Sequence, residues 1–268
     1  MRTLLLLALC LPLIADVEDT KTETRTFSGI HLVIADNVNG SIEATGYAGS
    51  DLQIEVTRIT RGETPERLQA ALREVKLDMT QSGDTAKLYV DGPFRGERPH
   101  RHEGYSVRYD FKLRVPASAR VDLYTVNQGS ITVRGVTGDF DVANVNGAIS
   151  IDGAAGSGRA HTVNGQVKVS YRSNPRGPSS FETVNGTVDL TFRPGLSADV
   201  RLETMNGGLY TDFEAGALPL SAPPPEKRDG RFVFRRGGST GVRIGTGGIE
   251  LKAKTLNGDI FLRKQDKS

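Results

Sequence analysis

One histidine and two glutamates, His161, Glu182 and Glu203, occupy the same position in three copies of a sequence repeat. Imidazole and carboxylate groups are common metal ligands. If the preceding residues face the core, these three side chains face outward in one column on consecutive coils, where stacked acids need a proton, a metal ion or a nearby cation. The alternative interpretation is that the three residues simply face solvent on their strands and bind nothing. We therefore predict no metal site. These three residues would be the candidate ligands if the protein had one.

The other residues that could do chemistry are dispersed. Most of the acids alternate with apolar residues, as solvent-facing strand positions do; these are Asp139, Asp141, Asp152, Asp189, Asp199 and Asp259. A glycosidase needs two convergent carboxylates, and the sequence offers no such pair. His100 and His102 lie in a charged loop with no further ligand in sight. We therefore predict a protein without catalytic residues and without a cofactor.

The composition predicts an all-β protein. Among 268 residues there are 31 glycines and no Trp, and 37% of the residues are hydrophobic, which is enough for a core. Lys plus Arg number 34 against 32 Asp plus Glu, so the net charge is only +2. That balance gives no field that would attract a polyphosphate, and we expect no nucleic-acid partner.

Residues 1–15 have the pattern of a signal peptide: a positive charge, an apolar run and a small residue at Ala15. The run is too short to span a bilayer, and we expect no transmembrane segment after it. Cys10, the only cysteine, makes a lipid anchor the alternative, but the bulky Leu9 before it favours cleavage near Ala15. We expect an exported protein, either periplasmic or at the cell surface.

Alternating apolar and polar residues predict strands before and after a single helix. Strands are expected at 30–34, 52–56, 87–90 and 106–115. One short helix is expected near 64–76, lying on the sheet, with Thr64 as its N-cap and Pro65 at its first position. Its apolar residues recur at helical spacing, at Leu68, Ala71, Leu72 and Val75.

Asn-Gly pairs mark a repeat along the chain. They occur at Asn39-Gly40, Asn146-Gly147, Asn164-Gly165, Asn185-Gly186, Asn206-Gly207 and Asn257-Gly258. With the variant at 127–129, the Asn positions from 127 to 206 fall 19, 18, 21 and 21 residues apart. We therefore predict a parallel β-solenoid, single-stranded and β-helix-like, with about 20 residues per coil. It covers 123–264, with an insertion at about 214–241, and follows an N-terminal β-rich part of the solenoid at 16–122.

A hairpin at each Asn-Gly is the rival interpretation, because this dipeptide favours two-residue turns. Around Asn185 a hairpin would place Glu182 opposite Asp189, an unfavourable pair. Parallel stacking instead matches like with like, since it forms a column of Thr162, Thr183, Thr204 and Thr255 and another of Val167, Val188, Leu209 and Ile260. We expect inward-facing Thr and Asn columns to hydrogen-bond from coil to coil, with glycine permitting a bulge at each corner.

The signature Thr-(Val/Met/Leu)-Asn-Gly-x-(Ile/Val/Leu) at the four Thr positions, with the strand Phe111–Pro116, resembles a bacterial group. It is similar to the putative adhesin, or Toast-rack, β-solenoid family, from about Thr24 to Arg263. The resemblance implies an envelope or surface location and a parallel β-helix-like fold. It implies no reaction, because no catalytic residues carry over. The chain departs from the pattern at 127–129, at Asn144, which replaces the Thr, and in its proline-containing insertion.

We therefore predict a non-catalytic, exported cell-envelope protein, adhesin-like or ligand-binding, whose partner is an envelope protein or glycan. Two alternatives stay open. One is a β-helix carbohydrate-active enzyme, which the dispersed acids and the absence of Trp disfavour. The other is an envelope stress-sensing module that acts through a partner.

Overall fold

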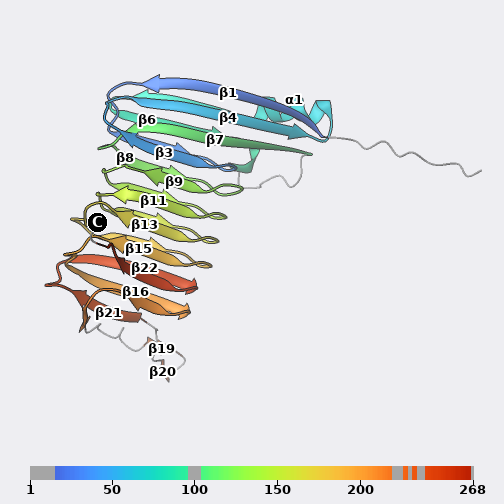
Figure 1. Cartoon of the computed structure of the whole chain (residues 1–268). Coiled ribbons are helices and arrows are strands. Elements are labelled where there is room, and N and C mark those ends of the chain that lie inside the picture. The colour runs from blue at the N-terminus through green and yellow to red at the C-terminus, as the bar shows by residue number, and fades with distance from the viewer. Residues whose placement is uncertain (1–15, 96–103, 219–225, 229–230, 234–238, 267–268) are drawn as a thin grey trace, which may run out of the picture.

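The computed structural model describes residues 16–95, 104–218, 226–228, 231–233 and 239–266. Two large β-sheets, one small sheet and one α-helix make up this part of the chain (Figure 1), so the all-β prediction is confirmed. No helix in these ranges is both long and apolar enough to cross a membrane. The expected signal peptide, Cys10, His100 and His102 lie outside the described residues.

Sheet 1 has ten strands and sheet 2 has eleven, and both sheets are open at their ends. In spatial order, sheet 1 contains β1 (Val17–Phe27), β4 (Leu52–Gly62), β7 (Tyr105–Pro116), β3 (Ile42–Tyr47), β9 (Ile131–Arg134), β11 (Ile149–Ala154), β13 (Val167–Tyr171), β15 (Val188–Phe192), β23 (Ile260–Lys264) and β17 (Leu209–Thr211). Sheet 2 contains β18 (Ala215–Leu218), β21 (Ser239–Ile244), β16 (Ala198–Asn206), β22 (Ile249–Asn257), β14 (Ser179–Glu182), β12 (Gly158–His161), β10 (Phe140–Ala143), β8 (Arg120–Tyr124), β2 (Leu32–Asp36), β6 (Thr85–Asp91) and β5 (Lys76–Ser82). The small sheet pairs β19 (Glu226–Arg228) with β20 (Arg231–Val233).

The strands on either side of each Asn-Gly corner lie in different sheets, so the corners are not hairpins. β14 precedes Asn185 in sheet 2, for example, and β15 follows it in sheet 1. We call such a pair of strands a rung. Neighbouring rungs pair in parallel with like residues opposite each other, as with Val167 and Val188. Antiparallel pairs occur toward the ends of the sheets, among them β1 with β4, β4 with β7 and β5 with β6.

The rungs do not follow one another in sequence order. The C-terminal rung, β22–β23, lies between β14–β15 and β16–β17, although β16–β17 precedes it in the chain (Figure 1). The expected column order Thr183, Thr204, Thr255 is therefore wrong, because Thr255 stands between the other two. The sequence does not reveal this order, because β16–β17 and β22–β23 carry Thr and Asn at the same positions. Either rung could therefore pair with β14–β15.

One apolar core lies between the two sheets, formed by alternate residues of their strands. In β13, Val167 and Val169 are buried while Lys168 is exposed. Larger rings fill the side where sheet 1 strands end, and the rings of Tyr171 and Phe192 stack with centroids 5.1 Å apart. Full burial of such side chains stabilises a fold by about 1.5–3 kcal/mol each.

The Thr column faces the core and links the rungs, as predicted. Thr183 Oγ1 donates to the carbonyl of Gly165 at 2.9 Å, and Thr255 Oγ1 donates to that of Gly186 at 2.9 Å. Asn144 takes the Thr position in its rung and donates to Gly129 O at 3.0 Å. These bonds satisfy polar groups that would otherwise be buried unpaired. The remaining members are Asn37, Thr125, Thr162 and Thr204.

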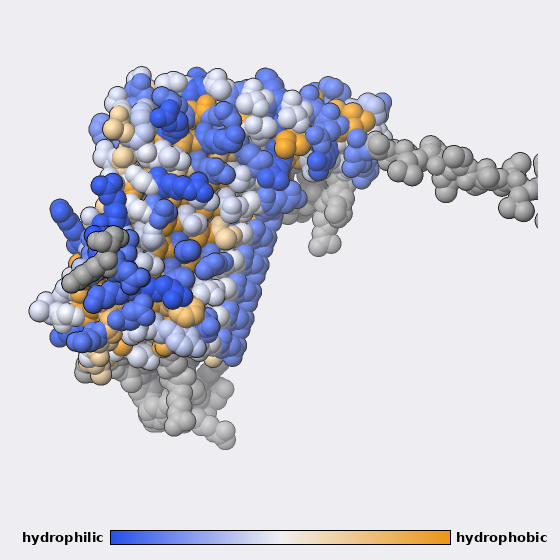
Figure 2. Space-filling view, viewed as in Figure 1, coloured by the Kyte–Doolittle hydropathy of each residue, from blue (hydrophilic) through white to orange (hydrophobic). Residues whose placement is uncertain are grey.

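The Asn column lies at the surface of the corner rather than facing inward. Each Asn amide donates to the side-chain oxygen of the next Asn, in the order 206, 257, 185, 164, 146, 127, at 2.7–2.8 Å. Figure 2 shows a regular hydrophilic column along this edge of the stack. We call these six side chains the Asn ladder. Asn39 donates to Val107 O instead.

Glycine is required at the corners mainly because the backbones of neighbouring rungs approach each other closely there. A Cβ on Gly147 would lie 2.0 Å from the carbonyl oxygen of Gly129, and one on Gly207 would lie 1.9 Å from that of Gly258. Real Cβ atoms essentially never come so close. Gly186 also has a positive φ of 156°.

The predicted helix is confirmed as α1, Pro65–Glu74. Thr64 is its N-cap and accepts a hydrogen bond from Arg67 N at 3.3 Å. The helix buries Leu68 and Ala71 and packs against β1, β4 and β7 of sheet 1. It therefore lies against sheet 1 at the N-terminal end of the stack.

Candidate functional site

The outer face of sheet 2 carries a row of side chains that crosses the rungs. Successive strands place Tyr124, Ala143, His161, Glu182, Lys254 and Glu203 opposite one another in register. A second row, one outward position earlier on each strand, contains Asp122, Asp141, Arg159, Ser180, Lys252 and Arg201. These two rows form the face on which we locate the site.

A slot lies where Ala143 separates two rings. Tyr124 and His161 stand two strands apart, about 9.6 Å at the usual strand spacing, and the small Ala143 forms the floor between them. The hollow has a volume of about 380 Å³ and is also lined by Asp141, Arg159, Ala160, Ser180 and Glu182. Such a slot offers ring faces beside polar groups, which is the usual make-up of a ligand site.

A second hollow adjoins the slot and shares Arg159 and Ser180 with it. Its volume is about 370 Å³, and its apolar contribution includes Pro178 and Leu218. The polar lining comes from Asp199, Arg201, Glu250 and Lys252. We call the two adjoining hollows the sheet 2 groove; it crosses the strands from β8 to β16.

Most acids in the groove are held by cations. Arg159 pairs with Asp141, and Lys252 pairs with Glu182 at 2.8 Å. Arg243 holds both carboxylate oxygens of Asp199, at 2.6 and 2.9 Å. Arg–carboxylate pairs with two parallel bonds fix geometry as well as charge.

These contacts lower the pKa of Glu182 and of Asp199. Burial raises the pKa of Glu182, but hydrogen bonds from Lys252 and Ser180 and the nearby His161 outweigh it and leave the pKa below its usual value. The hydrogen bond from Arg243 lowers the pKa of Asp199. Both carboxylates are therefore ionised at neutral pH. Burial raises the pKa of Tyr124, with the nearby Asp141 adding to the effect.

The candidate metal column differs from the expectation. His161 is opposite Glu182, but Lys254 stands between Glu182 and Glu203 and pairs with Glu203 at 2.9 Å. The compensating cation is thus a lysine of the C-terminal rung. Within the described ranges, no group of three or more His, Cys, Asp or Glu side chains could hold a metal ion.

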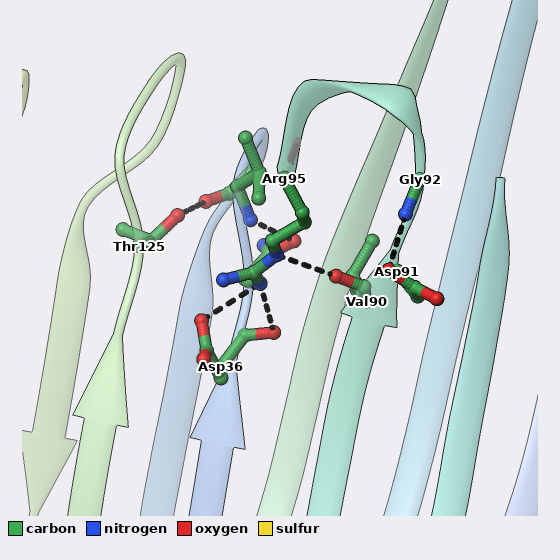
Figure 3. Close-up of polar contacts among 9 residues, drawn as sticks. Asp36, Val90, Asp91, Gly92, Arg95 and Thr125 are labelled. Atoms are coloured by element: carbon green, nitrogen blue, oxygen red, sulfur yellow. Dashed lines mark hydrogen bonds and ion pairs between the residues drawn. The ribbon is translucent and has the colours of Figure 1, made fainter. Parts of the chain in front are cut away.

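The N-terminal end of the row is closed by an arginine (Figure 3). Arg95, from the short 3₁₀ helix Pro93–Arg95, donates to Asp36 Oδ1 at 2.8 Å and to Val90 O at 3.0 Å. Asp36 is opposite Tyr124 in register, and the guanidinium lies 4.6 Å from the ring centroid of Tyr89. Arg95 therefore holds this end of the face in place.

Another depression lies on the outer face of sheet 1. It has a volume of about 630 Å³ and is lined by residues of β1, β3, β4 and β7, including Glu43, Glu55, Lys112 and Arg114. Lys112 and Glu55 pair at 3.0 Å. No aromatic ring lines this depression, so the sheet 2 groove is the stronger candidate for ligand binding.

One motif was missed at the sequence level: 237–241 spells Gly-x-Ser-x-Gly, the pattern of a hydrolase nucleophile elbow. Ser239 opens β21, an antiparallel neighbour of β16. A nucleophile elbow lies between a strand and a helix, and here a strand follows the serine. The motif therefore lacks the setting that the chemistry needs.

Comparison with protein-family models and with curated proteins finds no match. Solved structures similar to this one include a putative cell adhesion protein from Clostridium sporogenes ATCC 15579, with a TM-score of 0.46, 10% identity, and coverage of 92% of this chain and 100% of that chain. A putative adhesin from Bacteroides fragilis NCTC 9343 has a TM-score of 0.39 at 12% identity, covering 91% and 97%. One from Parabacteroides merdae ATCC 43184 has a TM-score of 0.27 at 8% identity, covering 92% and 96%. Their names agree with the family that the repeats resemble, and likeness at this level assigns no function to this chain.

Proposed function

We propose that this chain is an exported, non-catalytic binding protein of the cell envelope, adhesin-like, which holds an extended envelope ligand in the sheet 2 groove. The observation that carries the proposal is the pair of adjoining hollows on the outer face of sheet 2, lined by rings and charges. Export rests on the signal-peptide pattern of residues 1–15.

The alternating rungs support a solenoid of the β-helix type, with about 20 residues per turn, as the scaffold. In such a scaffold each rung repeats the same outward positions, so that a groove across several rungs presents a periodic surface. An extended ligand that runs along the stack matches that surface better than a compact one.

The acids support binding rather than hydrolysis. A glycosidase needs one carboxyl group with a raised pKa as its general acid. In the groove the pKa values of Glu182 and Asp199 are lowered, and Asp141 is paired with Arg159. We therefore favour the non-catalytic function over the carbohydrate-active enzyme.

Co-sedimentation of the purified protein with cell-envelope fractions tests this function. Wild type should sediment with the envelope material, and a Tyr124→Ala/His161→Ala variant should remain mostly in the supernatant. A Thr132→Ala/Lys168→Ala variant, changed on the outer face of sheet 1, is the matched control and should sediment like wild type. Equal sedimentation of all three proteins, or turnover of an envelope polysaccharide, would contradict the proposal.

A further inference from the structure

Among the side chains that the structure describes, Arg201 is a cation without a partner in the groove. Its side chain is exposed, and no acid among the described residues pairs with it. The acids on either side of it on the same face of β16 are already held, Asp199 by Arg243 and Glu203 by Lys254. On β21 the residue opposite Arg201 is Gly241, which has no side chain to fill the space.

A second cation stands beside Arg201. Lys252 is opposite it in register on the neighbouring parallel strand. Like charges directly opposite each other are unfavourable, and Glu182 neutralises only Lys252. This part of the groove is therefore ready to accept an anionic group, and an Arg binds a carboxylate best because its planar fork can donate two parallel hydrogen bonds.

The slot and the cation site lie in the two neighbouring rows of the same face. From Ala143 on β10 to Arg201 on β16 there are four strand spacings, about 19 Å along the stack. A single small ligand cannot reach both places. A polymer with rings at one position and an acidic group several units away can.

The acids in the groove decide what kind of polymer fits. Asp141, Glu182, Asp199 and Glu250 also line the hollows. They would repel a nucleic acid, which carries a phosphate at every unit. A glycan offers hydroxyl groups that donate to these carboxylates, and its ring faces can lie against Tyr124 and His161.

We propose that the sheet 2 groove binds an extended acidic polysaccharide, with a pyranose ring between Tyr124 and His161 and a uronate carboxylate on Arg201 and Lys252. This inference rests on the proposed function and names the ligand class of the same groove.

The test compares two forms of one polymer by isothermal titration calorimetry on the full chain. The acid form is polygalacturonate methyl-esterified on most units, so that only isolated carboxylates remain free, and the ester is the fully methyl-esterified form. The acid form should bind at least about tenfold more tightly, and added salt should weaken it selectively. Arg201→Ser should remove that preference, so that the acid form binds no more tightly than the ester. Arg201→Lys should keep part of the preference, because it retains the charge without the planar fork.

Tyr124→Ala should weaken both polymers, and Arg134→Ala, on the outer face of sheet 1, should change neither. Circular dichroism must show wild-type folding of each variant. Failure of the acid form to bind, equal binding of acid and ester, or an unchanged preference in Arg201→Ser overturns the inference. A single-stranded oligonucleotide that binds more tightly than either polymer also overturns it.

The two levels of failure are distinguishable. If the ester binds as well as the acid and Tyr124→Ala weakens both, the acidic ligand class is wrong and the groove function stands. If wild type sediments with envelope material and the Tyr124→Ala/His161→Ala variant does so equally, the groove function itself is wrong.

Discussion

Glu182 lies opposite Lys254, which belongs to the last rung of the chain, and not opposite Glu203, which comes next in the repeat. Lys254 in turn pairs with Glu203, so the column alternates in charge. In sequence order the two glutamates would be direct neighbours and would repel each other. The charge pattern thus favours the observed rung order, and that order places Lys252 beside Ser180 and Glu182 in the groove.

Reversal of the charge on Lys254 should lower stability. Lys254→Glu creates three acids in a column, and we expect a loss of about 1–2 kcal/mol in the free energy of unfolding, measured by denaturant titration. Adding Glu203→Lys should recover part of the loss, because it restores one pair with swapped signs. If Lys254→Glu unfolds at the wild-type denaturant concentration, charge does not contribute to the rung order.

The Asn ladder should stabilise the corners more in its middle than at its end. Asn164→Ala removes two side-chain hydrogen bonds, one to Asn146 and one from Asn185. Asn206→Ala, at the end of the ladder, removes one. At about 1 kcal/mol per bond, the free energy of unfolding should fall roughly twice as far for Asn164→Ala. Equal losses would argue against a connected ladder.

A methyl group at a corner glycine should be poorly tolerated. Gly147→Ala would push a Cβ against Gly129 O at 2.0 Å, so adjacent rungs must separate, and we expect a loss of about 1–3 kcal/mol or more. Gly216→Ala is the control, since its Cβ would meet nothing within 4 Å. Thermal unfolding of the two variants compares them directly. A Gly147→Ala protein with the wild-type melting temperature would show that close approach does not select glycine.

Stability should fall in acid, in part through Asp110. Burial raises the pKa of Asp110, but hydrogen bonds from Ser41 and the adjacent guanidinium of Arg108 outweigh it, so the folded pKa lies below the usual value of an aspartate. A depressed folded pKa adds stability that is present above the unfolded pKa and is lost as pH falls through the folded value. Asp110→Asn should therefore flatten the decline in melting temperature below about pH 4 relative to wild type. An unchanged acid profile for Asp110→Asn would contradict this assignment.

The sequence is informative about the fold because its repeats carry pairing information. The Thr positions predict parallel rungs, and Thr64 and Pro65 predict the start of α1. The rung order could not be predicted, because Thr204 and Thr255 stand in repeats that are equally compatible with β14–β15. Only the opposite charges of Glu203 and Lys254 indicate the rung order. A rule that favours acids opposite lysines on neighbouring strands could have predicted it.

The groove is less visible in the sequence than the scaffold. His161 and Glu182 were identified through their place in the repeat, yet Tyr124 and Arg201 have no motif of their own. Their positions become meaningful only when the register places Tyr124 two strands from His161, and Arg201 beside Lys252. Such relations depend on tertiary pairing, which local patterns do not specify.

Engineered disulfides test the rung order most directly, in a Cys10→Ser background. Neighbouring strands bring Cα atoms within the range of about 4.4–6.8 Å that a disulfide spans, and strands two apart, at about 9.6 Å, do not. We predict that Ser180→Cys/Lys252→Cys forms a disulfide under mild oxidation and that Ser180→Cys/Arg201→Cys does not. The reverse result, a link from position 180 to 201 and none to 252, would place the rungs in sequence order and contradict the pairing of Lys252 with Glu182 in the groove.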